Sequence, residues 1–142
     1  MIRGGFMIGD VWVPNQFTIV GMQQVIRAAF HQVPLDWSAG MCAHNQADSL
    51  ALVNIQEPDG TNGYVRQAIS GDDAGWPNIG VINNESYIES RPLVFPGGPY
   101  SLATNRMFLT DGTQVIAISS PRPEGLSTDP VEANTRYRLY FR

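Results

Sequence analysis

The sequence predicts a mainly β protein: an antiparallel β-sandwich or jelly-roll-like domain with one α-helix near the N-terminus. Short apolar segments recur along the chain and are separated by clusters of Gly, Pro, Asn and Asp, which is typical of sandwiches and barrels. Only residues 17–33 have apolar side chains at helical spacing. The 142 residues fit one domain with a core of ordinary size. We therefore expect a single domain over residues 17–142.

Residues 1–16 form a segment interrupted by glycines, and Pro14 lies near its end. We predict that it is an arm laid on a neighbouring subunit, or an edge strand of the domain. Phe6 and Trp12 favour the arm, because large apolar side chains at a chain terminus need a surface that buries them. Phe6, Ile8 and Trp12 are therefore candidate contact residues.

Residues 17–33 are expected to form the helix. Apolar side chains at spacings of three and four predict one buried stripe, made of Met22, Val25, Ile26, Ala29, Phe30 and Val33. Asn15 or Thr18 would cap the start, and Pro34 ends the helix.

The strands are expected in the rest of the chain. Residues 35–43 alternate between apolar and polar side chains, which predicts a strand with one buried face. Residues 50–55 fit either a helical turn or a short strand. Residues 71–84 read as a loop anchored by Trp76 and Ile79. The remaining strands are predicted at 64–70, at 86–95 with a break near Pro92, in a hairpin of 105–109 and 114–119 around Asp111-Gly112, and at 135–142.

The closing strand has two different faces. Tyr137, Leu139 and Phe141 alternate with a second set of side chains, Arg136, Arg138, Tyr140 and Arg142. Arg and Tyr are enriched at binding hot spots, so this second face is a candidate docking surface. An ordinary solvated face would have the same alternation, and the sequence leaves both interpretations open.

A motif in the middle of the chain resembles a known family. Glu57-Pro58 is followed by a short polar turn and then by Gly63-Tyr64-Val65-Arg66-Gln67-Ala68. This pattern is similar to that of small tailed-bacteriophage virion proteins of β-rich fold, labelled tail-fibre-like or capsid-decorating. Val65 stands where that family often has Ala. The resemblance implies a virion protein assembled in the host cytoplasm, with the major capsid protein or other virion proteins as partners.

Within this motif, Glu57 and Arg66 are expected to form an ion pair. A buried arginine must be paired, and Glu57 lies just across the turn from Arg66. We interpret the pair as an internal clamp that fixes the turn, with an intersubunit contact as the alternative.

Composition and motifs make several function classes less favoured. The formal net charge of −4 argues against nucleic-acid binding, which needs a basic patch. All nine basic residues are Arg, which indicates either a protein largely covered by partners or a compositional drift of the source genome. No apolar stretch is long enough for a membrane span. Cys42 and His44 lack a supporting motif for a nucleophile pair, and two histidines are too few for a zinc site.

We therefore expect a non-enzymatic virion structural protein, a capsid cement or decoration protein that forms a small homo-oligomer. A tail, baseplate or fibre component of the same particle is the close alternative. A carbohydrate-binding sandwich is the more distant one, since Trp12, Trp37 and Trp76 would offer aromatic surface for a sugar.

Overall fold

The computed structural model describes residues 2–43 and 51–142, which contain nine strands, one α-helix and two short 3₁₀ helices. Their bounds, in chain order, are β1 (Ile2–Ile8), β2 (Val11–Phe17), α1 (Ile19–His31), β3 (Trp37–Cys42), η1 (Leu52–Asn54), η2 (Thr61–Gly63), β4 (Gln67–Ile69), β5 (Asn78–Ile82), β6 (Glu85–Glu89), β7 (Arg106–Thr110), β8 (Val115–Ser119) and β9 (Thr135–Phe141).

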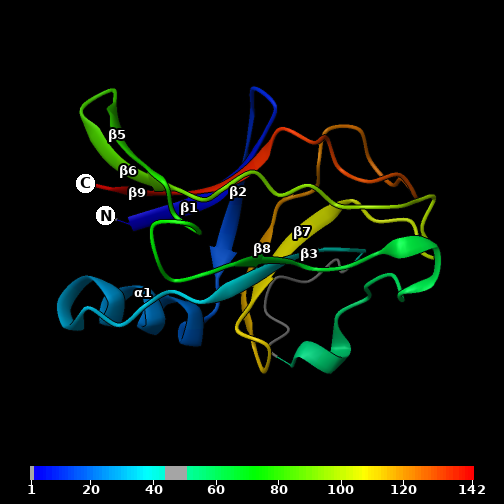
Figure 1. Ribbon diagram of the computed structural model, residues 1–142, viewed down its shortest axis with the longest axis horizontal. Helices are drawn as coiled ribbons and strands as arrows, with labels where there is room; N and C mark the ends of the chain where they lie inside the picture. Colours follow the sequence, from blue (N-terminus) through cyan, green and yellow to red (C-terminus); the bar gives the residue numbers. More distant parts are fainter. Residues whose placement is uncertain (1, 44–50) are drawn as a thin grey trace.

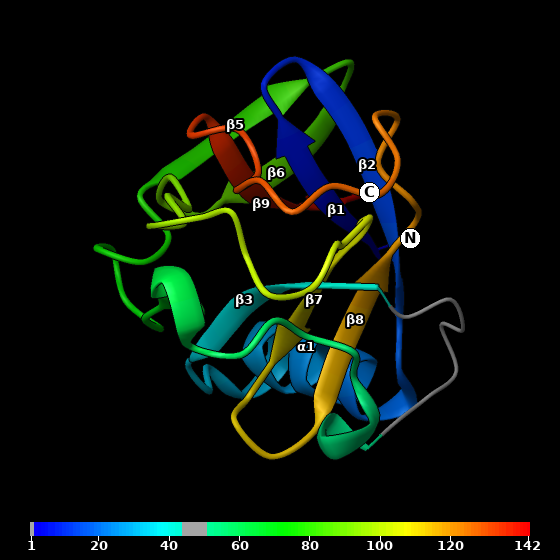
Figure 2. The ribbon, with the colours of Figure 1, turned by 90° about the vertical axis from the view of Figure 1, so that its right-hand side faces the viewer.

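All nine strands belong to one antiparallel sheet in the order β4-β3-β7-β8-β2-β1-β9-β6-β5. The sheet curls into two facing layers because β2 belongs to both. Residues 11–14 pair with β1, and residues 15–17 pair with β8. Figures 1 and 2 show β1, β9, β6 and β5 on one side and β3, β7 and β8 on the other. The predicted mainly β fold with one helix is confirmed, and its two layers are parts of a continuous sheet.

The core fills the space between the layers. Tyr137 of β9 is fully buried, and its ring contacts Phe6, Trp37 and Trp76 at centroid distances of 5.0, 6.1 and 6.2 Å. These edge-to-face contacts hold both layers together through one side chain. Trp37 lies in the core, as its alternation predicts.

The prediction of an N-terminal arm or edge strand is wrong, because β1 lies in the middle of the sheet between β2 and β9. Its side chains alternate strictly, so Phe6 and Ile8 point into the core, with exposed fractions of 0% and 7%. Gly5 allows β1 to pack closely against β2. A Cβ there would lie 2.5 Å from the Val13 carbonyl oxygen and 2.8 Å from the Trp12 ring. The glycines of this segment therefore serve close packing.

Helix α1 is fastened to the sheet mainly by its first turns. The Thr18 hydroxyl accepts a hydrogen bond from Gly21 N (3.0 Å) and donates one to the Val115 carbonyl oxygen (2.8 Å), so Thr18 is the cap. Of the predicted stripe, Val25 is fully buried. Ile26, Ala29, Phe30 and Val33 are exposed, whereas the first turns of the helix pack on β8. The predicted burial of these four side chains is wrong.

The remaining elements follow the predictions unevenly. The hairpin of β7 and β8 around Asp111-Gly112 is confirmed, as is the closing strand β9. Residues 71–84 were expected to be a loop, but they contain β5. Asn83 and Asn84, with φ angles of 52° and 64°, form the tight turn from β5 to β6. This Asn-Asn pair was the sequence signal for a hairpin at this place. Among the described residues, no helix has the length and apolar character needed to cross a membrane.

Candidate functional site

An ordered ladder of arginine and aromatic side chains covers the outer face of β2, β1, β9 and β6. We call Trp12, Arg3, Tyr140, Arg138 and Tyr87 the arginine–aromatic ladder. They share a face because the strand register sets Arg3 opposite Tyr140, and Tyr140 opposite Tyr87. Tyr137 and Leu139 alternate with Arg138 and Tyr140 and point into the core, so the ladder points away from it.

The members of the ladder stack on one another. The guanidinium carbon of Arg3 lies 4.2 Å from the Tyr140 ring centroid and 5.6 Å from that of Trp12. The guanidinium carbon of Arg138 lies 4.6 Å from the Tyr87 ring and 5.6 Å from the Tyr140 ring. Trp12 and Tyr140 meet edge to face at 5.2 Å. These cation–π contacts hold long side chains in one conformation.

Two carboxylates neutralise part of the charge. Glu85 accepts hydrogen bonds from Arg3 Nε (3.3 Å) and Nη2 (2.8 Å), and these bonds lower the pKa of Glu85. Glu89 accepts from Arg138 Nε at 2.7 Å and from Arg136 Nη1 at 3.2 Å. Burial lowers the pKa of Arg138, but its hydrogen bonds to Tyr140 and Glu89 outweigh that effect and leave the pKa raised. Both arginines therefore stay charged at any physiological pH.

The ladder side chains are held by their mutual contacts and remain partly open to solvent. Arg138 and Tyr140 are buried by their neighbours, whereas Trp12 and Tyr87 are half-buried and the Arg3 side chain is 44% exposed. A surface whose aromatic and arginine side chains are already fixed loses little conformational entropy on binding. This arrangement suits docking onto a protein surface.

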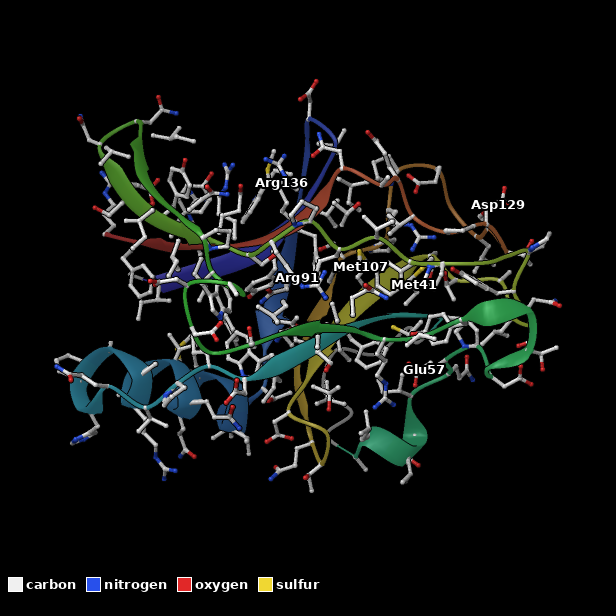
Figure 3. All side chains as sticks on the ribbon, in the orientation of Figure 1. Met41, Glu57, Arg91, Met107, Asp129 and Arg136 are labelled. Atoms are coloured by element: carbon white, nitrogen blue, oxygen red, sulfur yellow. The ribbon has the colours of Figure 1, made fainter. Side chains whose placement is uncertain are left out.

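The predicted contact residues divide between two sides of the sheet. Trp12, Arg136, Arg138 and Tyr140 come together on the outer face, and Figure 3 shows Arg136 on the side of β9 that faces away from β3 and β7. Arg142 is exposed at the end of β9, where its charge helps to lower the pKa of Glu85. Phe6 and Ile8 do not belong to this set, because they are core residues.

Arg3, Tyr87, Glu85 and Glu89 were missed from sequence. The alternation of side chains within β1 and β6 was visible in the sequence. The sequence did not show that these two strands lie beside β9, because that depends on pairing between distant segments. The strand register supplies this information, and it adds one cation and two anions to the predicted face.

The Glu57–Arg66 pair is present, and Figure 3 shows Glu57 well away from Arg136. Arg66 donates from Nε and Nη2 to the two oxygens of Glu57, at 2.9 and 2.7 Å. The Tyr64 hydroxyl donates to Glu57 at 2.6 Å and accepts from Met41 N at 2.9 Å. Burial and the adjacent Glu57 carboxylate raise the pKa of Tyr64 well above its ordinary value. The pair lies within the chain, and through Tyr64 it ties the motif to β3.

A second open surface is an apolar groove between α1 and the hairpin of β5 and β6. It has a volume of about 350 Å³, and its lining includes Val25, Ala29, Ile79, Ile88, Leu139 and Phe141. Ile79, which lines the groove, is 79% exposed. The prediction that Ile79 anchors a loop is therefore wrong. The groove exists because α1 is held by its first turns and the sheet curls away from its second half.

Other predicted chemistry finds no support in the described residues. Trp37 and Trp76 are buried in contact with each other, so Trp12, Trp37 and Trp76 do not form a platform for a sugar. Cys42 is buried, and His44 lies outside the described residues. Within 2–43 and 51–142 no group of three or more His, Cys, Asp or Glu side chains is placed to hold a metal ion.

Comparison with known protein families, with curated proteins and with solved structures finds no match for this chain.

Proposed function

We propose that the chain is a non-enzymatic structural protein of a tailed-phage virion, which acts as a cement or decoration protein on the capsid. The arginine–aromatic ladder is the observation that carries this proposal. Trp, Tyr and Arg dominate binding hot spots, and here three such aromatic rings and two such guanidinium groups form one ordered surface. The resemblance of the Glu57–Ala68 motif to phage virion proteins is the reason for proposing a tailed-phage particle.

The charge of this face indicates what it binds. Arg3, Arg136, Arg138 and Arg142 lie on or beside it with two carboxylates, Glu85 and Glu89, although the whole chain has a formal net charge of −4. The face therefore has an excess of positive charge within an acidic protein. A capsid surface that presents carboxylates beside apolar side chains is complementary to it.

A cement protein stabilises a shell because it binds the assembled subunits better than the free ones. Purified chain added to shells assembled without it should bind at saturable sites and raise the temperature at which the shells come apart. Sedimentation of shells with bound protein gives the occupancy, and a map of the loaded particle shows whether the chain lies on the capsid or on the tail.

The Trp12→Ala variant tests the ladder directly. It removes the exposed end of the stack, and we expect binding to shells to weaken by about tenfold or more. Phe30→Ala is the matched control, because it removes an exposed aromatic ring from α1, outside the ladder, and should bind like the unmodified chain. Equal binding by both variants, with both folded, would contradict docking through the ladder.

A further inference from the structure

The free edge of β5 is a second surface of the molecule that is suited to binding. In the part of the chain that the structure describes, β5 has a neighbouring strand on one side only, β6. Edge strands in natural proteins are usually protected by charge, proline, a bulge or a covering segment. Residues 78–84 contain no charged residue and no proline, and Ile79 and Val81 are 79% and 68% exposed. This edge has none of the usual sequence features that prevent pairing.

The turn geometry shows which backbone groups are available. Asn83 and Asn84, both with positive φ, form a two-residue turn between Ile82 and Glu85. The residues that flank such a turn form a hydrogen-bonded pair, and the pairs then alternate along the hairpin. Gly80 opposite Tyr87 is thus hydrogen-bonded, whereas Ile79 and Val81 are in non-hydrogen-bonded pairs. The N–H and C=O groups of Ile79 and Val81 therefore point away from β6, along the free edge.

We infer that β5 pairs with β5 of a second copy of this chain, in antiparallel register about a two-fold axis at Gly80. This register sets Ile79 opposite Val81 of the second copy, and Val81 opposite Ile79, so that the outward N–H and C=O groups of both residues are satisfied. A two-fold axis requires a surface that is complementary to itself, and the spacing of these groups about Gly80 meets that requirement. The inference does not depend on the proposed virion role.

The same pairing also covers apolar surface. Ile79 shares its face of the sheet with Ile88, which lines the groove, and Val81 lies on that face as well. With the axis perpendicular to the sheet, the grooves of both copies lie on one side of a continuous sheet, where their exposed apolar side chains are brought toward one another. The cores of homodimer interfaces are more apolar than the rest of a protein surface, so covering these side chains would stabilise the pair. Both ladders then lie together on the opposite side.

Sedimentation analysis of the purified chain over a wide concentration range tests the dimer. The unmodified chain should be dimeric. Val81→Pro removes an N–H that points to the edge and leaves the bonds to β6 intact, so a folded chain with dimerisation weakened by about tenfold or more is expected. Val81→Thr keeps the N–H and is the matched control, expected to remain dimeric. A monomeric unmodified chain, or a Val81→Pro variant as dimeric as Val81→Thr, would overturn the inference.

Disulfide cross-linking tests the register. Residues 79 and 81 of different copies would face each other with Cα atoms about 5.5 Å apart, within disulfide range, whereas identical residues would be roughly 7–8 Å apart on the diagonal. An oxidised mixture of Ile79→Cys and Val81→Cys variants should therefore form a covalent dimer that neither variant forms alone. Cross-links in the single variants equal to those in the mixture, or none in the mixture, would show that this register does not occur.

Discussion

A few side chains of one short motif can join a turn to a strand elsewhere in the chain. Glu57 illustrates this, since its carboxylate is shared by Tyr64 and Arg66 while the Tyr64 hydroxyl also holds the backbone of β3. The motif that gives the resemblance to phage proteins is therefore a structural joint. Its residues fix a turn against a strand and leave the outer face of the sheet free for contacts.

Loss of the clamp should lower stability. In Arg66→Ala, the mostly buried Glu57 carboxylate keeps the Tyr64 hydroxyl and loses two charge-assisted hydrogen bonds. We expect the free energy of unfolding to fall by about 1–2 kcal/mol, because the one-third exposure of Arg66 lets water replace part of the interaction. Urea unfolding followed by tryptophan fluorescence measures the change.

The control for this experiment is Arg27→Ala, which removes an exposed arginine from α1 and should leave stability nearly unchanged. An Arg66→Ala chain with unaltered unfolding but defective assembly would show that Arg66 is an intersubunit contact.

At the scale of elements, α1 depends on a close approach to the sheet. A Cβ at Gly21 would lie 2.1 Å from the Ile116 carbonyl oxygen, and that oxygen belongs to the backbone of β8, a strand inside the sheet. The helix can pack at this depth because residue 21 has no side chain. The glycine that weakens helix propensity is thus the residue that fixes the helix in place.

Gly21→Ala should therefore destabilise the protein, although alanine is the better helix former by about 1 kcal/mol. Overpacking against backbone is expected to lower the free energy of unfolding by about 1–3 kcal/mol. Gln23→Ala, on the exposed side of the same helix, is the control and should be neutral or slightly stabilising. Chemical denaturation of both variants gives the comparison, and a Gly21→Ala chain at least as stable as the unmodified one would contradict this account of the packing.

Elements with a strong local pattern were predictable from the sequence. The hairpin around Asp111-Gly112 and the alternating strand β9 carry their own signals, turn residues and period two. Strand β5 has no such alternation, because its side chains are exposed on both faces of an edge, and its glycine and asparagines read as a loop. The N-terminal segment was predicted wrongly as an arm or edge strand for a different reason. Whether a strand lies in the middle or at the edge of a sheet depends on its pairing with distant segments.

The candidate site shows the same division. Alternation in β9 correctly grouped Arg136, Arg138 and Tyr140 on one face. The ladder itself could not be predicted from the sequence. Arg3 comes from the first strand and Tyr87 from the sixth, and no local sequence pattern gives the register that places them side by side. The groove was also missed, since the helical stripe gave the apolar side chains of α1 without showing which of them the sheet leaves uncovered.

At the scale of the whole molecule, the sheet depends on its last strand. β9 lies between β1 and β6 and supplies Tyr137 to the core. A chain that ends at residue 134 loses the connection between β1 and β6 and the residues that pack against Phe6. We expect it to be unfolded or aggregated, as measured by far-UV circular dichroism and sedimentation, whereas removal of Arg142 alone should leave a folded protein. A folded chain of 134 residues would show that the remaining strands form a sheet without β9.

The pairing of the first strand with the last also governs how the molecule is made. β1 is synthesised before β9, yet one edge of β1 stays unsatisfied until residues 135–141 have been made. Contacts between segments this far apart in sequence form late and slowly, so the nascent protein carries an open, apolar strand until those residues emerge. We interpret the two glycines and Arg3 on that strand as protection during this interval, because small and charged residues make a poor template for premature association.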